Sequence, residues 1–446
     1  MNEQIKQRIE QLNNGEVPRG YKKTEIGVFP SDWVTDKTLG DLFDFYGGLS
    51  KSRDELGEEG YAYLHYGDLH RGTFNTVSID QYEQLPKCDI SLTGKEKCLM
   101  KDGDVAFLDA SEDLEGTSRA VLIDNPENKP FIAGLHIIYG KAKNNSLDKW
   151  FKQYITSSES VKKQFQRLAV GFKVYGVNRD TIPRIRVAFP SSKKEQSRIA
   201  EILMKWDEAI ELYEKQIDAL TCYKAVCLRK MFPAKGQNVP EWRFQGFSDD
   251  WEQRKLGDYC KLFNGDRSAK YPDAQDLVAE GIPFINAGDL VDGHVNLATA
   301  NKITRAKYDE LGGAKLRYGD IVYCLRGTLG KNAYIDNFTE GTVASSLVAI
   351  RPKNIDGRYL FHVLNSDIEY RQRIVHDEGA AQPNLSAKSV SEFVIPIPDV
   401  DEQNNITCFL NNLSNLITLH QRKKEALINQ RKTLQQYLLN GIVRVR

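Results

Sequence analysis

The sequence predicts an α+β protein: two similar mixed α/β domains separated by two long antiparallel helices that form a coiled-coil spacer, with pseudo-twofold symmetry. Two observations predict this fold class. An ordered series of short motifs occurs twice, and a long segment with helical periodicity follows each copy. We therefore expect a first domain with an N-terminal helical arm over residues 1–190, a first helix over 191–235, a second domain over 236–398 and a second helix over 399–446.

The two domains are predicted by motifs that recur in the same order. The clearest pairs are Ser31-Asp32-Trp33 with Asp249-Asp250-Trp251, Gly103-Asp104-Val105 with Gly319-Asp320-Ile321, and Phe189-Pro190 with Ile397-Pro398. These anchors are tryptophans, Gly-Asp pairs and strand-like apolar runs, which have structural rather than catalytic character. The polar loops differ between the copies, for example 47–53 against 264–270 and 109–119 against 325–332. One scaffold is thus expected to carry two different sets of loops.

The two helices are predicted by apolar residues that recur at three- and four-residue steps after Pro190 and Pro398. A helix of roughly 38 residues spans about 55 Å, and a single apolar stripe of that length requires a partner. The other copy is the nearest candidate; the alternative is that each helix packs only on its own domain. The expected seam consists of Ile199, Leu203, Trp206, Ile210 and Ile217 in the first helix and Leu410, Leu413, Ile417 and Leu427 in the second.

The composition excludes several functional classes. The 61 basic residues balance 61 acidic residues, so the protein has no uniformly basic coat, although a local basic face remains possible. The seven cysteines form no CxxC pair and no Cys/His cluster with zinc-ligand spacing, so we expect no metal site. The charged N-terminus and the absence of an 18-residue apolar stretch favour a cytoplasmic protein with no membrane role.

Catalytic motifs are missing from the sequence. There is no Pro-Pro for the loop with which an adenine methyltransferase holds a flipped base, and no GxGxxG loop follows a strand. Pro272-Asp273 and Pro398-Asp399 lack the Asp/Glu-x-Lys that a nuclease site requires, and the histidines form no HExxH. We therefore expect a noncatalytic chain; a nuclease or methyltransferase with an unrecognised site is the alternative.

The polar loops contain residue types that contact DNA. Between Lys141 and Arg186, eleven basic residues stand against three acidic ones, and the glycine-containing loop 171–179 mixes aromatic residues, an amide and two cations. Ordinary solvated turns, or a coiled-coil adaptor with no DNA role, remain the alternatives. The candidate DNA-binding residues are Ser50, Lys51, Arg53, Lys173, Tyr175, Asn178 and Arg179 in the first domain and Arg267, Lys270, Arg326, Lys331, Gln382, Asn384 and Ser386 in the second.

The chain resembles the specificity (S) subunit of a type I restriction-modification system. The resemblance covers nearly the whole chain and is carried by IGVFPSDWVTDKTLGD, GFSDDWEQRKLGDY, GAAQPNLSAKSVSEFVIPIP, the two Pro-then-EQ helix starts and KMFPAKG. It implies two target-recognition domains, each for one half of a bipartite double-stranded DNA target. The helices are then expected to act as a ruler and as the docking surface for two modification subunits.

The resemblance also implies the chemistry of the partners. The modification subunits would bind S-adenosylmethionine and methylate adenine, and restriction subunits with ATP-driven translocation, which requires magnesium, would join for cleavage. No cofactor is expected in this chain. The first copy has Val174-Tyr175-Gly176 where the second has Gln382-Pro383-Asn384, so the glutamine of the family motif has no counterpart in the first domain. Because the loops differ, we predict an asymmetric target.

Overall fold

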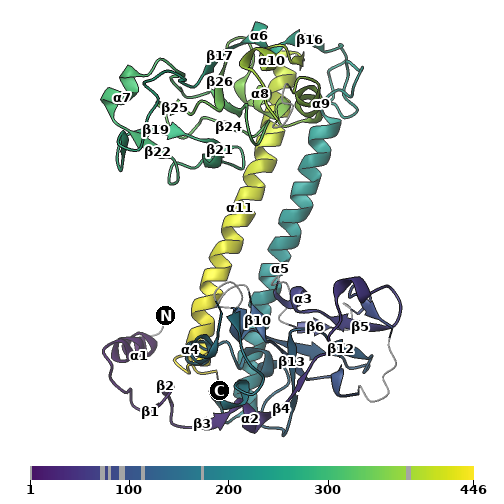
Figure 1. The fold of residues 1–446 in the computed structure, drawn as a ribbon, viewed down its shortest axis with the longest axis vertical. Coiled ribbons are helices and arrows are strands. Elements are labelled where there is room, and N and C mark those ends of the chain that lie inside the picture. The colour runs from purple at the N-terminus through teal and green to yellow at the C-terminus, as the bar shows by residue number, and fades with distance from the viewer. Residues whose placement is uncertain are drawn as a thin grey trace. The chain divides into compact units, whose positions relative to one another are not determined.

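The chain forms two compact units in the computed structural model (Figure 1). Unit 1 contains Met1–Leu212 and Lys423–Arg446, and unit 2 contains Tyr213–Arg422. The boundary crosses both long helices, so each unit contains part of each helix. The structure describes residues 3–70, 76–78, 82–89, 96–111, 116–171, 175–377 and 383–445.

Unit 1 is built on a mixed five-stranded sheet in the order β4-β13-β9-β11-β6, in which only the β11–β6 pair is parallel. A four-stranded sheet in the order β7-β5-β12-β8 shares a hydrophobic cluster with it. The strands are β4 (Phe43–Gly47), β5 (Tyr61–Leu64), β6 (Thr76–Ser78), β7 (Lys87–Cys88), β8 (Leu99–Met100), β9 (Val105–Leu108), β11 (Ala120–Asp124), β12 (Phe131–Ala133) and β13 (Ile137–Ala142).

The central strand β9 is apolar throughout because both of its faces are covered. Val105 and Phe107 join one buried cluster with the helices, whereas Ala106 and Leu108 join the cluster shared with the second sheet. Successive side chains of a strand point to opposite faces, so a continuous apolar run is required here rather than an alternating one.

The remaining elements of unit 1 surround this core. The pairs β1–β2, β3–β15 and β10–β14 are all antiparallel. These elements are α1 (Glu3–Asn13), β1 (Tyr21–Thr24), β2 (Gly27–Pro30), β3 (Trp33–Thr38), α2 (Leu39–Leu42), η1 (Arg53–Glu55), α3 (Tyr66–His70), η3 (Glu96–Cys98), β10 (Ala110–Ser111), η4 (Gly116–Ser118), η5 (Trp150–Tyr154), α4 (Glu159–Leu168), β14 (Tyr175–Gly176), η6 (Ile182–Arg184) and β15 (Arg186–Pro190).

Unit 2 repeats this order of elements. The sheet β17-β26-β23-β24 corresponds to β4-β13-β9-β11, the parallel pair β19–β25 to β5–β12, and β16–β27 to β3–β15. Its elements are β16 (Glu252–Lys255), α6 (Leu256–Tyr259), β17 (Cys260–Asn264), β18 (Leu277–Val278), β19 (Ile282–Ile285), η7 (Ala287–Asp289), β20 (Leu290–Val291), β21 (His294–Val295), β22 (Asn301–Ile303), α7 (Arg305–Glu310), β23 (Ile321–Cys324), β24 (Asn332–Tyr334), β25 (Thr342–Val343), β26 (Leu347–Pro352), α8 (Gly357–Val363), α9 (Asp367–Val375), α10 (Ala387–Ser391) and β27 (Val394–Ile397).

The long helices are α5 (Lys193–Lys230) and α11 (Val400–Leu439). In unit 1, Ile199 and Leu203 near the start of α5 share a buried cluster with Leu438 near the end of α11. In unit 2, Cys227 near the end of α5 shares a cluster with Leu410 near the start of α11. Because the start of one helix meets the end of the other in each unit, the helices run antiparallel.

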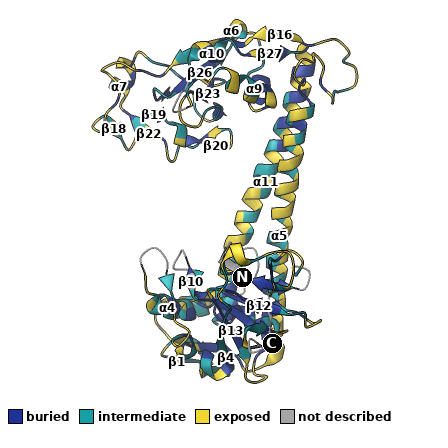
Figure 2. Ribbon diagram, turned by 45° about the vertical axis from the view of Figure 1, so that its right-hand side comes forward, coloured by how far each residue is buried: buried dark blue, intermediate teal, exposed yellow. Residues whose placement is uncertain are grey.

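The expected seam residues lie on the inner side of these helices. Burial is complete near the domain cores and partial farther along the helices (Figure 2). Within unit 2, the rings of Tyr213 and His420 lie 5.5 Å apart, so the helices contact each other as well as their own domain. Ile199, Leu203, Leu410 and Leu413 are buried, and Trp206, Ile210, Ile217, Ile417 and Leu427 are half-buried.

The two Pro-then-EQ motifs are helix-start anchors. Glu402 is 1% exposed and accepts hydrogen bonds from Arg243 at 2.8 Å and from the indole Nε1 of Trp251 at 3.0 Å. In unit 1, Arg444 makes the corresponding contact with Glu195 at 2.6 Å. Arg243 follows the end of α5 and pairs with the start of α11, whereas Arg444 follows the end of α11 and pairs with the start of α5. In each unit, the segment after one helix therefore anchors the start of the other.

These features confirm the predicted α+β class with two similar domains and long antiparallel helices. Among the residues that the structure describes, no helix combines the length and apolar character needed to cross a bilayer.

Candidate nucleic-acid interface

In unit 1, the predicted loops converge on a pocket of about 780 Å³. Gly47 and Gly48 at the end of β4, the turn before β13 and the segment after β14 line it. A Cβ on Gly48 would lie 2.0 Å from the carbonyl oxygen of Gly134, so only glycine permits this close approach of the two loops. The pocket lining extends from Gly47 to Thr181, so segments up to 134 residues apart in sequence meet at one surface.

Two of the candidate DNA-binding residues, Asn178 and Arg179, line this pocket. Arg179 is exposed and lies beside Gly47, and its ion-pair partner among the described residues is Asp180, at 3.8 Å. The side-chain oxygen of Asn178 accepts a 2.9 Å hydrogen bond from the backbone of Asp180, so it serves the turn into η6. Tyr175 pairs with Ser111 across β10–β14 and is half-buried. Arg179 is therefore an available cation at this pocket.

The segment with Ser50, Lys51 and Arg53 is more constrained. Lys51 Nζ lies 2.7 Å from Glu55, and this hydrogen bond is the main reason why the pKa of Glu55 falls to about 2. Arg53 lies 3.5 Å from Asp68. Both ion pairs are exposed, and exposed pairs contribute little free energy, so DNA phosphates can compete for the cations. Ser50 is exposed beside them.

Tyr63 holds this segment in place. Its ring is fully buried, and its hydroxyl donates to the carbonyl of Leu49 at 2.6 Å. The same oxygen accepts from the backbone of Leu135 at 2.7 Å and of Lys51 at 3.2 Å. One buried hydroxyl therefore joins the loop after β4 to the turn before β13.

That turn contains functional candidates that sequence reasoning missed. The Nδ1 atom of His136 lies 2.9 Å from the carboxylate of Asp109, and the His136 ring meets Tyr66 edge-on at 5.3 Å. His136 also has a φ of 62°, a conformation that is uncommon outside glycine and is concentrated at functional sites. Asp109 and His136 thus offer a donor and acceptors at the pocket, and Tyr66 packs against the His136 ring.

In unit 2, three of the predicted residues also converge. Arg267 donates to the carbonyl of Ser345 at 3.3 Å, and Arg326 donates to the side chain of Asn384 at 3.1 Å. The backbones of Arg326 and Asn384 form a β-bridge, and the adjacent Leu325 bonds to Ser346. Arg267, Arg326 and Asn384 therefore border one turn, although the sequence separates them by up to 117 residues.

The other candidates in unit 2 have more local roles. Lys270 is exposed, 3.8 Å from Glu310, and Lys331 donates to the carbonyl of Ala287 at 2.9 Å. Ser386 is the N-cap of α10, where its hydroxyl accepts from the backbone of Ser389 at 3.0 Å. Lys173 and Gln382 lie outside the described residues.

The loops of unit 2 are supported differently from those of unit 1. The position of Tyr63 is taken by Phe284, which has no hydroxyl. Instead the buried carboxylate of Asp266 accepts from the backbone of Ser268 and of Gly312, both at 2.7 Å. These bonds, that with Ser268 first, lower the pKa of Asp266.

A buried polar cluster supports the loop between β23 and β24. Glu369, on α9, accepts from the hydroxyl of Tyr323 and from Arg373 at 2.8 Å. Burial raises the pKa of Glu369, and a Cβ on Gly330 in the loop would lie 2.6 Å from Arg373. In the alignment of the two repeats, the positions of Tyr323, Glu369 and Arg373 are occupied in unit 1 by the apolar residues Phe107, Val161 and Phe165.

The local basic excess between Lys141 and Arg186 is smaller in the fold than in the sequence. Lys149 lies 2.7 Å from both Asp102 and Asp124, and Lys143 lies 3.2 Å from Asp44. These acids precede the segment in the chain, so counting charges within it overstated its positive character. The interface is better described by individual exposed cations such as Arg179 than by a basic half-domain.

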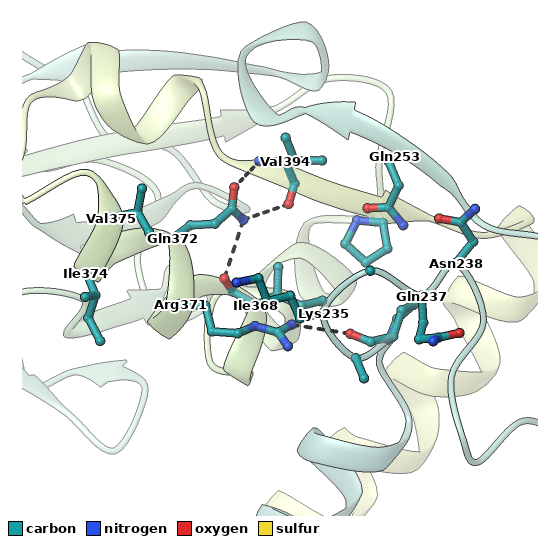
Figure 3. A pocket seen from close by; sticks show the side chains of 14 residues that line it. Lys235, Gln237, Asn238, Gln253, Ile368, Arg371, Gln372, Ile374, Val375 and Val394 are labelled. Carbon is teal, nitrogen blue, oxygen red and sulfur yellow. Dashed lines mark hydrogen bonds between the residues drawn. The ribbon is translucent and has the colours of Figure 1, made fainter.

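A separate apolar groove of about 550 Å³ follows the end of α5 (Figure 3). It lies between the loop 233–238, helix α9 and the β16–β27 pair, and Ile374 and Val375 expose their side chains there. Gln372 is fixed at its edge by two hydrogen bonds with the backbone of Val394, at 2.6 and 2.8 Å. The groove contains none of the candidate DNA-binding residues.

Comparison with known proteins agrees with this duplicated arrangement. The family model described as "Type I restriction modification DNA specificity domain" matches residues 30–221 and again residues 248–430. The chain belongs to this family. The two matches cover both domains and most of both helices, and DNA target recognition is the general role of such specificity subunits, which are themselves noncatalytic.

Individual relatives of the specificity family match over nearly the whole chain. The type I restriction enzyme MjaVIII specificity subunit of Methanocaldococcus jannaschii is 24% identical, over 94% of this chain and 94% of its own. The crystal structure of the type I restriction-modification system S subunit from M. genitalium is 18% identical with a TM-score of 0.54, covering 91% of this chain and 96% of the other. A chain from a structure on complex assembly and conformational transition of the type I R-M system is 16% identical with a TM-score of 0.55. The match covers 96% of this chain and 100% of the other.

Proposed function

We propose that this specificity subunit recognises an asymmetric bipartite sequence in double-stranded DNA and directs adenine methylation and restriction by partner subunits. One observation carries the proposal: equivalent loop positions on the repeated scaffold bear different side chains. Asp109 and His136 of unit 1 correspond to Leu325 and Ser346 of unit 2, because both pairs make the same backbone hydrogen bond. Different donors and acceptors select different bases, so the two half-sites differ.

The arrangement of the candidate residues supports direct contact with DNA. Arg179 in unit 1 and Arg267 and Arg326 in unit 2 are exposed cations at loops held by a buried support. Arginine donates in a bidentate manner to guanine or to phosphate, and a rigid support fixes which contact it makes. The amide of Asn384 beside Arg326 adds a group suited to adenine.

Partner subunits supply the chemistry in this proposal. Two modification subunits would carry S-adenosylmethionine, and restriction subunits would carry ATP and magnesium; the assembly would act in the cytoplasm, where it meets DNA. Exposed apolar side chains on the long helices support their role as a docking surface. These are Leu212 and Ile428 in unit 1 and Tyr223, Leu416 and Leu419 in unit 2.

The test is single-molecule sequencing of adenine methylation in cells that express the chain with its modification subunit, compared with cells that lack the chain. We expect one split, asymmetric motif that disappears on deletion. Arg179→Ala should relax or weaken recognition of one half and Arg326→Ala that of the other, by about 1–3 kcal/mol for a base contact. Lys205→Ala, at an exposed lysine of α5, is the matched control.

Three results contradict the proposal. A palindromic motif removes the asymmetry, a methylome unchanged by deletion removes the specificity role, and methyl transfer by the isolated chain shows that it has a catalytic site of its own.

A further inference from the structure

An ion-pair lock in unit 1 joins both long helices to the domain. Asp207 on α5 accepts from Arg431 on α11 at 2.8 and 3.1 Å and from the hydroxyl of Tyr154 at 3.0 Å. Tyr154 is 2% exposed, and the side chains of Arg431 and Asp207 are about four-fifths buried. The carboxylate of Asp207 is thus the centre of the lock.

The repeat identifies the same positions in unit 2. Glu195 in α5 and Glu402 in α11 make equivalent contacts, so they align the two helix sequences. In this alignment Asp207 corresponds to Ser414, and Arg431 corresponds to Lys224. Ser158 and Ser366 are the N-cap residues of α4 and α9 and therefore occupy equivalent positions. Tyr154 and His362 each lie four residues before that serine, so they correspond as well. The cation is kept as lysine, but the carboxylate is replaced by a hydroxyl. Ser414 donates within its own helix, to the carbonyl of Leu410 at 2.8 Å.

A cavity of about 400 Å³ lies at these positions. Lys224, His362 and Ser414 line it, with the amides of Asn411 and Asn415. Among the described residues, no carboxylate forms an ion pair with Lys224 within 4.0 Å, whereas its counterpart Arg431 has one at 2.8 Å. Removal from water lowers the pKa of Lys224, and Asp292 at the lining only partly opposes this effect.

The other basic groups at the cavity are already paired or neutral, and the carboxylate of Asp292 is an acidic group of its lining. Arg358 lies 3.3 Å from Asp336 and stacks on Tyr334 at 4.6 Å. His362 is 2% exposed and shares a 2.9 Å hydrogen bond with Asn411, and burial lowers its pKa to about 4, so its ring is neutral at pH 7. Lys224 is therefore the cation that an incoming group meets. A half-buried cation without a close counter-ion is unfavourable, and an anion beside it relieves that cost.

We propose that this cavity is an anion-binding site in which a carboxylate or phosphate group pairs with Lys224 and takes the place that the Asp207 carboxylate occupies in unit 1. The amides of Asn411 and Asn415 supply neutral hydrogen-bond donors around it, while the Ser414 hydroxyl remains bonded to Leu410. The anion completes in unit 2 the lock that unit 1 builds from its own chain. Its source is either a small free anion or an acidic side chain of an assembling subunit.

Calorimetric melting of the full chain with inorganic phosphate, at constant ionic strength, tests the first source. At ten times its Kd, phosphate should raise Tm by about 3–6 °C. Ser414→Asp supplies the missing carboxylate, so this variant should melt at a higher temperature without phosphate and should no longer respond. Lys224→Met should also lose the response. Lys215→Met, an exposed lysine of the same helix outside the cavity, should keep it.

Affinity for the modification subunit tests the second source. If the anion is a partner's carboxylate, phosphate leaves Tm unchanged, and both Lys224→Met and Ser414→Asp weaken assembly at least tenfold relative to Lys215→Met. The proposal is overturned if assembly is unaffected and phosphate either has no effect or raises Tm equally in all four proteins.

Discussion

Removal of the Tyr63 hydroxyl should loosen one half of the target interface without disturbing the other. Tyr63→Phe keeps the buried ring but deletes the atom that joins the loop after β4 to the turn before β13. The backbone groups of Leu49 and Leu135 then lose hydrogen bonds of 2.6 and 2.7 Å. An unsatisfied buried polar group costs about 1–3 kcal/mol. With water reaching part of the loop, we expect the free energy of unfolding to fall by about 2–4 kcal/mol.

The functional effect should be confined to the half-site that unit 1 contacts. Both loops carry candidate groups, including Lys51 and His136, so their positions become less defined in Tyr63→Phe. We expect discrimination at that half-site to fall while the half-site of unit 2 remains strictly required. Urea unfolding measures the first effect, and binding of the assembled complex to DNA with either half-site scrambled measures the second.

Tyr359→Phe is the matched control. Tyr359 is fully buried in unit 2, and its hydroxyl donates a single hydrogen bond to the carbonyl of Pro396 at 3.0 Å. Its loss should cost about 1 kcal/mol and leave discrimination at the unit 1 half-site unchanged. The reasoning is refuted if Tyr63→Phe is no more destabilising than Tyr359→Phe, or if it relaxes both half-sites equally.

Three further predictions concern stability. Arg243→Met leaves Glu402 buried without its cation and should cost about 3–5 kcal/mol in urea unfolding, whereas the double variant with Glu402→Gln should recover part of this loss; additive losses would contradict the pairing. The pKa of Asp266 lies below its unfolded value because Ser268 and Gly312 donate hydrogen bonds to the carboxylate. The ionised carboxylate therefore stabilises the fold above the unfolded pKa of about 3.9. This stabilisation is lost as the pH falls through the lower folded pKa. The urea midpoint should therefore drop over that range in the native chain and less in Asp266→Asn; parallel pH profiles would exclude this role. Gly48→Ala should reduce folded yield and lower Tm, because its Cβ would meet the Gly134 carbonyl at 2.0 Å, while Gly57→Ala, with nothing within 4 Å, should change Tm little; equal values would show that the loops can separate.

Much of the fold was predictable because repeated motifs have repeated structural tasks. Trp251 and Glu402 are hydrogen-bonded to each other, and Glu195 anchors its helix in the same way, so these residues kept a recognisable order in both copies. The helical periodicity also indicated the seam, since apolar spacing follows directly from which face is buried. The spatial convergence of Arg267, Arg326 and Asn384 follows from strand pairing, which the sequence indicates only indirectly.

The candidate site was less predictable because its contacts join residues that share no pattern. His136 and Asp109 are 27 residues apart and have no polar counterpart pair in the second copy, so neither spacing nor the repeat marks them. Tyr63 lies in an apolar strand and gave no sign that its hydroxyl serves two loops. Charge counting along the chain also missed Asp44, Asp102 and Asp124, which neutralise lysines far from them in sequence.

The closing contacts after each helix set an order of completion during synthesis. Unit 2 has all its parts once residue 422 has left the ribosome, including the Arg243 that covers Glu402. Unit 1 receives Arg444 only after its first 212 residues and the whole of unit 2 have been made. Glu195 therefore lacks its cation while about 250 further residues are synthesised. The unit encoded first is therefore completed last, by the segment that follows α11.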